Sequence, residues 1–167
     1  MVSDPLKVTY LELREPPATV PGGAAAEGIE LETPSIEAYL DLYRRVGAPY
    51  RWDSRLKMER TALESLLLGG DLHVYVERVR GEAIGFCEFD RAAFPVIELK
   101  NFGLVPEAQG RGIGPRLLGT SLQREWESGA ERIWLHTDTW DHPAAVPVYE
   151  RAGFRVYDVR YEVPESL

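Results

Sequence analysis

Residues Val105–Gly114, "VPEAQGRGIG", decide how this sequence is interpreted, because they place three glycines between a predicted strand and a predicted helix. The apolar residues of "VIELKNFGL" predict a strand that ends at Leu104. An amphipathic helix is predicted next, with apolar residues along one side at Ile113, Leu117, Leu118, Leu122 and Trp126. The stretch is therefore predicted to be a turn that leads from a strand into a helix.

Such a turn can bind an anion. The first turn of a helix carries unpaired N–H groups and a partial positive charge. Glycine lacks a Cβ atom, so Gly110, Gly112 and Gly114 would let a phosphate approach the backbone, and Arg111 adds a positive side chain. The number of glycines alone leaves two interpretations open, a phosphate-binding loop and a tight turn without a ligand.

Two known phosphate-binding motifs fit poorly. A Walker loop requires Gly-Lys followed by Ser or Thr, whereas Gly114 is followed by Pro115 and Arg116. The dinucleotide fingerprint requires Gly-x-Gly-x-x-Gly, whereas the sequence here is Gly-x-Gly-x-Gly. A dinucleotide-binding domain is therefore the weaker alternative.

The rest of the chain predicts a mixed α/β sheet in one domain. A hairpin around Arg80 and Gly81 comes before the glycine-rich stretch, and a strand, a helix and a last strand follow the helix after it. We expect residues 1–27 to form an N-terminal arm with one strand at Leu6–Leu13, and residues 28–167 to form the main domain. Helices are predicted at residues 36–46 and 55–68.

Composition narrows the functional class. The 167 residues carry a formal net charge of -8, which argues against nucleic-acid binding through phosphate neutralisation. Cys87 is the only cysteine and the three histidines are dispersed, so no disulfide and no metal site are expected. No apolar run is long enough to span a membrane, and we expect a cytoplasmic protein that does not bind membranes.

Two separated motifs resemble the GNAT superfamily of acetyl-CoA-dependent N-acetyltransferases. Residues Gln109–Gly114 match its Gln/Arg-x-x-Gly-x-Gly/Ala signature, and "VYERAGF" at 148–154 is similar to its late helix and the start of its last strand. The resemblance implies a GNAT-like fold, with a mostly antiparallel central sheet flanked by helices. It covers residues 70 to 161 best.

The resemblance also implies a cofactor site for acetyl-CoA. The pyrophosphate would bind at Gln109, Gly110, Arg111, Gly112, Ile113 and Gly114, and the pantetheine arm would run along Phe102, Gly103 and Leu104. A glycine inside a strand suits a bulge or a close approach by a ligand, so the residues themselves leave both readings of Gly103 open.

The same resemblance suggests catalytic residues. Tyr149 matches the family's general acid, and a tyrosine stays protonated at neutral pH. Pro147 lies two residues earlier and would remove a helical hydrogen bond unless the helix begins late. Glu98 is the proposed base, because it lies eleven residues before Gln109, as the base does in the histone-modifying branch. Strand alternation places Glu98 on the face of Phe102 unless a bulge intervenes, and an ion pair with Lys100 is the competing interpretation.

Three residues in the first part of the chain are candidates for binding the acetyl acceptor. Tyr43, Trp52 and Asp53 could bind an amine through aromatic and ionic contacts, or they could simply pack beneath a loop. We expect direct acetyl transfer to a primary amine of a small molecule or peptide. A catalytically inactive acetyl-CoA-binding sensor or interaction domain is the alternative. A homodimer is compatible with the sequence.

Overall fold

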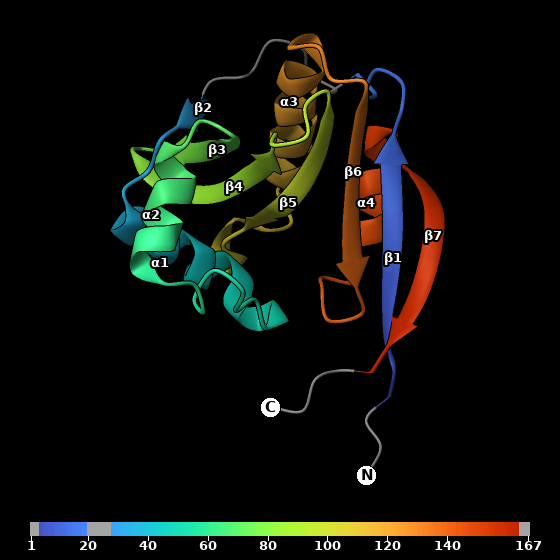
Figure 1. The fold of residues 1–167 in the computed structure, drawn as a ribbon, viewed down its shortest axis with the longest axis horizontal. Helices are drawn as coiled ribbons and strands as arrows, with labels where there is room; N and C mark the ends of the chain where they lie inside the picture. The colour runs from blue at the N-terminus through green and yellow to red at the C-terminus, as the bar shows by residue number, and fades with distance from the viewer. Residues whose placement is uncertain (1–3, 20–27, 164–167) are drawn as a thin grey trace.

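The computed structural model describes residues 4–19 and 28–163 of the chain. Their core is a seven-stranded sheet with the strand order β2-β3-β4-β5-β6-β1-β7 (Figure 1). All neighbouring strands are antiparallel except β5 and β6, so the predicted mixed and mostly antiparallel sheet is confirmed. The strands are β1 (Leu6–Leu13), β2 (Ile29–Glu32), β3 (Leu72–Val79), β4 (Glu82–Asp90), β5 (Val96–Leu104), β6 (Arg132–Asp138) and β7 (Arg155–Glu162).

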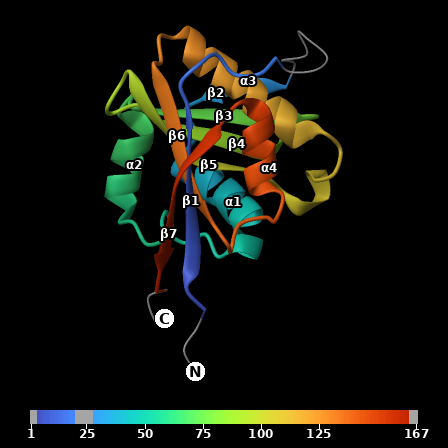
Figure 2. The ribbon, with the colours of Figure 1, turned by 90° about the vertical axis from the view of Figure 1, so that its right-hand side faces the viewer.

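Helices cover both faces of this sheet. The α-helices among the described residues are α1 (Ile36–Gly47), α2 (Arg60–Leu68), α3 (Ile113–Glu127) and α4 (Ala145–Ala152). Tyr39 of α1 contacts Phe86, whereas Glu125 of α3 contacts Tyr75, and these two strand residues point to opposite faces of the sheet. Figure 2 shows α2 and α4 on opposite sides of β7. The described helices include none with the length and apolar character needed to cross a bilayer.

The predicted N-terminal strand forms, and it lies inside the sheet. β1 pairs with β6 on one side and with β7 on the other. The segment expected to be an arm therefore contributes an internal strand of the sheet, next to the edge strand β7. The boundary that we expected between residues 27 and 28 adjoins residues 20–27, which lie outside the described part of the chain.

Two helices begin later than the sequence predicts. The expected helix at residue 55 begins at Arg60, because Arg55 is instead drawn into contacts with the sheet. The late helix begins at Ala145, so Pro147 lies in its first turn, where a missing N–H group costs little. Tyr149 therefore follows Pro147 in an uninterrupted helix.

β5 and β6 pair over only three residues and then separate. Val96 is opposite Arg132, Ile97 is opposite Ile133 and Glu98 is opposite Trp134. Beyond these pairs, β5 continues along β4 and β6 continues along β1, and the two strands diverge (Figure 1). The divergence leaves backbone and side chains of both strands available to line an opening through the sheet.

A bulge in β5 changes which side chains share a face. Glu98 is opposite Asp90 and Asn101 is opposite Glu88, and the register shifts between these pairs. Directly opposed residues of antiparallel strands point to the same face. Asn101 therefore shares the face of Glu98, and Phe102 points to the other. The expectation that Glu98 and Phe102 share a face was wrong, because the bulge reverses the alternation.

Candidate active site

A pocket of about 770 Å³ opens where β5 and β6 diverge. It is lined by the second half of β5, the glycine-rich loop, the end of β6, the start of α4 and the loop after α1. Most of the predicted site residues lie in its wall, namely Tyr43, Trp52, Asp53, Phe102, Gly103, Leu104, Gln109, Gly110, Gly112, Gly114 and Tyr149. Glu98, Arg111 and Ile113 do not line it.

The glycine-rich loop has the backbone that an anion site requires. Gly110 and Gly112 have φ angles of +77° and +75°, a region that other residues seldom adopt. Gly112 is the N-cap of α3, and its lack of a side chain leaves the first N–H groups of the helix uncapped. A Cβ atom at either glycine would meet nothing within 4 Å, so the space beside the loop is open. These features fit a bound phosphate group.

The other loop residues play different parts. The Arg111 side chain is exposed, and Ile113 packs against the hydrophobic core. Gly103 has a packing reason of its own, because a Cβ atom there would lie 2.5 Å from Cγ1 of Val46 in α1. The bulge in β5 occurs before Gly103, between Leu99 and Asn101. The group that approaches Gly103 closely on the α1 side of the sheet is therefore Val46 of that helix.

Tyr149 lies in the pocket wall with only 9% of its surface exposed. Its ring packs against Phe102 and Phe154, with centroids 6.0 and 5.9 Å away. None of the described residues forms a hydrogen bond with its hydroxyl group. Burial, together with the negative charge of Asp141, raises the pKa of Tyr149 above its usual range. The phenol is therefore neutral at pH 7 and can donate a proton into the pocket.

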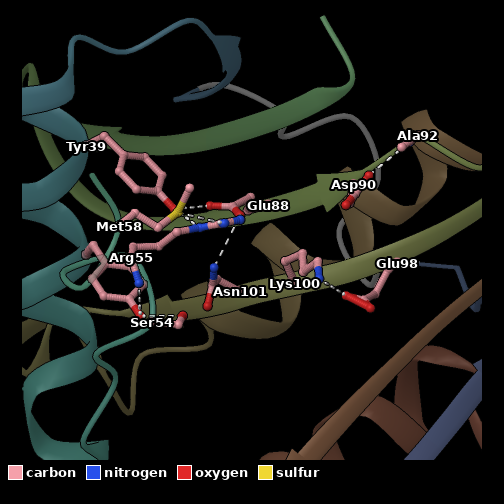
Figure 3. A network of polar contacts seen from close by, with 11 residues as sticks. Tyr39, Ser54, Arg55, Met58, Glu88, Asp90, Ala92, Glu98, Lys100 and Asn101 are labelled. Carbon is pink, nitrogen blue, oxygen red and sulfur yellow. Dashed lines mark hydrogen bonds and ion pairs between the residues drawn. The ribbon is translucent and has the colours of Figure 1, made fainter. Parts of the chain in front are cut away.

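Glu98 lies outside the pocket wall. Its Oε2 is 2.7 Å from Nζ of Lys100, and Figure 3 shows the two side chains directed toward each other. This is the ion pair of the competing interpretation. The geometry does not support Glu98 as the base, because the strand alternation that would have aimed it with Phe102 is reversed at the bulge.

The loop after α1 reaches both sides of the pocket. Gln109 donates a hydrogen bond from Nε2 to the hydroxyl group of Tyr50 at 3.1 Å. Trp52 donates from Nε1 to Oδ1 of Asp141 at 3.2 Å. Trp52 packs directly against the backbone of Gly47 at the end of α1. A Cβ atom at position 47 would lie 2.5 Å from Cβ of Trp52, so only glycine leaves room for the tryptophan. The aromatic loop residues thus bridge the glycine-rich loop and the end of β6.

The sequence analysis missed a buried polar network beside this loop. Glu88 in β4 is fully buried and accepts hydrogen bonds from Tyr39, from Nη2 of Arg55 at 2.5 Å and from Nδ2 of Asn101 at 3.2 Å (Figure 3). Arg55 and Asn101 also line the pocket. The network joins α1, the loop after α1 and β5 to Glu88 in β4. No pattern in the sequence links these residues, since they are 13 to 49 positions apart from Glu88.

Asp138 is a second pocket residue that the sequence analysis did not single out. It is the last residue of β6, and its Oδ1 accepts a hydrogen bond from the backbone N–H of Trp140 at 2.8 Å. Burial and then the charge of Asp141 raise the pKa of Asp138. The available signal was a carboxylate at the end of a predicted strand.

Cys87 and the histidines do not form a reactive centre of their own. Cys87 is fully buried outside the pocket wall, and burial raises the pKa of its thiol. His136 and His142 line the pocket, whereas His73 contacts Glu125 on the face that α3 covers. Within residues 4–19 and 28–163, no group of three metal-ligating side chains could hold a metal ion.

Comparison with known proteins identifies the group to which these features belong. Residues 36–154 match the model of the acetyltransferase (GNAT) family. A mycothiol acetyltransferase from Kytococcus sedentarius is 30% identical over 155 residues, which cover 89% of this chain and 52% of that protein. The chain thus spans about half the length of this curated relative.

Solved structures share the fold. A GCN5-related N-acetyltransferase from Sphaerobacter thermophilus has a TM-score of 0.64 at 22% identity, covering 95% of this chain and 51% of its own. An acetyltransferase from Bacillus subtilis, solved in complex with CoA, has a TM-score of 0.60 at 18% identity and covers 78% of this chain and 77% of its own. The predicted GNAT-like fold is confirmed.

Proposed function

Because the chain belongs to the acetyltransferase (GNAT) family, we propose that it transfers the acetyl group of acetyl-CoA directly to a primary amine. The observation that carries the proposal is the pocket between β5 and β6. Its lining combines an uncapped, glycine-rich helix start, an aromatic loop and Tyr149. Such a pocket can hold a donor and an acceptor at the same time.

The donor half of the pocket suits CoA. Members of the GNAT family use acetyl-CoA, and the uncapped N–H groups around Gly112 would bind its pyrophosphate. Phe102, Gly103 and Leu104 line the same wall and would lie along the pantetheine arm. When it is bound, acetyl-CoA supplies an activated thioester, whose carbonyl carbon accepts the amine nitrogen.

Tyr149 would supply the proton for the departing thiolate. Its buried phenol is neutral and has no hydrogen-bond partner among the described residues, so its proton is available to a group in the pocket. Cys87 is buried outside the pocket, which favours direct transfer in a ternary complex over a route through an acyl-cysteine. The acceptor would be a small molecule or a peptide that reaches Tyr43, Trp52 and Asp53.

The proposal is tested by thiol release from acetyl-CoA in the presence of a panel of primary amines, with products identified by mass spectrometry. The panel includes the acceptor of mycothiol acetyltransferases, amino acids, polyamines, aminoglycosides and peptides with free N-termini. We expect amine-dependent thiol release and an N-acetylated product. Tight acetyl-CoA binding without turnover of any amine would instead support an inactive acetyl-CoA-binding domain.

A further inference from the structure

Building on the proposed function, we propose that Asp138 binds the ammonium group of the acceptor and takes a proton from it. The acceptor class would then be primary amines that are cationic at neutral pH. This assigns to Asp138 the role that the sequence had suggested for Glu98.

The first observation is the position of Asp138 relative to the two faces of the sheet. Glu98 and Trp134 are neighbours in the parallel pair, and His136 and Asp138 follow Trp134 on the same face of β6. This face also carries Asn101 and Gly103 of β5. Asn101 donates a hydrogen bond to Glu88, and Gly103 lies beneath Val46 of α1. Asp138 therefore points to the face that α1 and the aromatic loop cover.

Tyr149 approaches from the opposite face. It packs against Phe102, which the β-bulge places on the face opposite to Glu98 and Asn101. Asp138 and Tyr149 nevertheless line the same pocket, because the pocket passes between β5 and β6 where the strands separate. A thioester between the strands would thus have a proton acceptor on one side and a proton donor on the other.

The second observation is the state of the other carboxylates. Asp53 is half exposed and forms an ion pair with Lys57 at 2.8 Å. Asp141 accepts hydrogen bonds from three groups, which are Nε1 of Trp52, Oγ1 of Thr137 and the backbone N–H of Asp138. Glu98 pairs with Lys100 outside the pocket. Each of these carboxylates is either occupied or turned away from the acceptor.

Asp138 differs from them. Its Oδ1 accepts the backbone N–H of Trp140, and the backbone N–H of Asp141 also stabilises its ionised form, but its carboxylate forms no ion pair with a described residue. The lysine and arginine side chains in the pocket wall are already engaged, since Lys100 pairs with Glu98, Arg55 pairs with Glu88 and Arg51 lies over the ring of Trp140 at 4.9 Å. His136 of the same strand also faces the pocket, and its charge favours the ionised form of Asp138. Asp138 therefore carries a carboxylate without an ion-pair partner among the described residues, and it can attract a cation that enters between Trp52 and Trp140.

The environment also makes Asp138 a better proton acceptor than an ordinary aspartate. Burial, and then the charge of Asp141, disfavour its ionised form and raise its pKa. In the proposed step, one N–H bond of the ammonium group breaks and an O–H bond forms on Asp138. The neutral amine then attacks the thioester carbon. The C–S bond would then break as the thiolate receives the proton of Tyr149, and the nitrogen of the new amide would give its extra proton to the tyrosine oxygen. Asp138 releases its own proton to water.

The test compares Asp138→Asn with the wild-type chain in steady-state acetylation of a cationic amine. We expect kcat/KM for the amine to fall about 100-fold at pH 7, as for the loss of a general base. The Kd for CoA should remain within twofold. Raising the pH toward the pKa of the amine should restore much of the rate, because the free amine no longer needs the carboxylate. Asp138→Glu should keep more activity than Asp138→Asn.

Asp158→Asn is the matched control, since Asp158 is a strand aspartate of β7 outside the pocket and bonded to Arg160. Its kinetics should equal those of the wild-type chain. Circular dichroism and thermal unfolding report whether each variant folds. Unchanged kinetics in folded Asp138→Asn would overturn the inference, as would an equal loss at all pH values or a loss in Glu98→Gln alone.

Calorimetry separates this inference from the proposed function. We expect a cationic amine to bind the CoA complex of the wild-type chain and to bind the Asp138→Asn complex at least tenfold more weakly. If no amine is acetylated, the proposed function fails, while amine binding that depends on Asp138 would still support the inference. Acetylation with equal amine affinity in both chains would overturn the inference and leave the function standing.

Discussion

Nε2 of Gln109 donates a hydrogen bond to the hydroxyl group of Tyr50, and this contact joins the glycine-rich loop to the aromatic loop after α1. The two residues are 59 positions apart and come from the proposed donor and acceptor walls of one pocket. The contact gives a physical route by which one loop can influence the geometry of the other.

Replacing Tyr50 with Phe removes the acceptor of this hydrogen bond. Gln109 keeps its contact with the carbonyl oxygen of Leu104 at 3.4 Å, so the loop should stay folded. A hydrogen bond of this kind is worth about 1 kcal/mol, which corresponds to a roughly fivefold weaker affinity for CoA. Isothermal titration calorimetry with CoA measures the change. Full wild-type affinity would mean that the two loops are independent.

Gly112→Ala should weaken CoA binding more than it weakens the fold. Gly112 and Gly81 both have positive φ angles and open space where a Cβ atom would lie, but only Gly112 belongs to the proposed phosphate site. Each alanine should cost about 1 kcal/mol of stability through backbone strain.

Gly81→Ala in the β3–β4 turn is therefore the control. Thermal unfolding should show similar losses for the two variants, and only Gly112→Ala should lose CoA affinity, by at least tenfold. Equal affinities in both variants would remove the glycine-rich loop from the cofactor site.

Tyr149→Phe tests the general acid. The hydroxyl group has no hydrogen-bond partner among the described residues, and the ring contacts with Phe102 and Phe154 are kept. We expect kcat to fall about 100-fold while stability and CoA affinity change little.

The raised pKa of Tyr149 adds a pH prediction. The wild-type rate should show no loss through ionisation of Tyr149 at the pH where a free tyrosine ionises, because burial raises the pKa of this phenol above that of a free tyrosine. A decline centred near pH 10 that disappears in Tyr149→Phe would contradict the buried position of this side chain.

Glu88→Gln should destabilise the fold. Glu88 is fully buried and pairs with Arg55, whose side chain is only 13% exposed, so the change leaves an uncompensated charge inside the protein. The expected loss is about 3 kcal/mol in the free energy of unfolding. Urea denaturation measures it. The double variant Glu88→Gln with Arg55→Leu should recover part of the loss, whereas a strictly additive result would show that the pair does not interact.

Glu125 should make stability depend on pH. Burial alone would raise its pKa, but hydrogen bonds from His73, Tyr75 and Arg91 outweigh it, and the pKa lies below its usual range. The group therefore contributes stability at pH values above its unfolded pKa of about 4.3, and this stability is lost as the pH falls through the folded pKa. Urea unfolding between pH 7 and pH 3 should show a smaller decline in Glu125→Gln. An identical pH dependence in both chains would contradict this.

The local patterns of the sequence determined most of the fold. The two-residue turn at Arg80 and Gly81 predicted the antiparallel hairpin of β3 and β4, and the alternation of apolar residues predicted β5 and β6. The stretch with Gly110 and Gly112 predicted a turn between a strand and a helix, and the structure has this turn, with positive φ angles at both glycines. Such features depend on residues that are neighbours in the chain, which is why the sequence alone reveals them.

Only the tertiary structure decided which side chains share the pocket. Glu98 lies where the resemblance to the family suggested a catalytic base, yet one extra residue in β5 separates it from the face of Phe102. Asp138, Asn101 and Arg55 enter the pocket wall because strands and a loop distant in sequence converge there. A bulge depends on pairing with the neighbouring strand, and burial depends on the whole fold. The sequence therefore determined the loop and the family, and the packing of the sheet determined which acid can meet the acceptor.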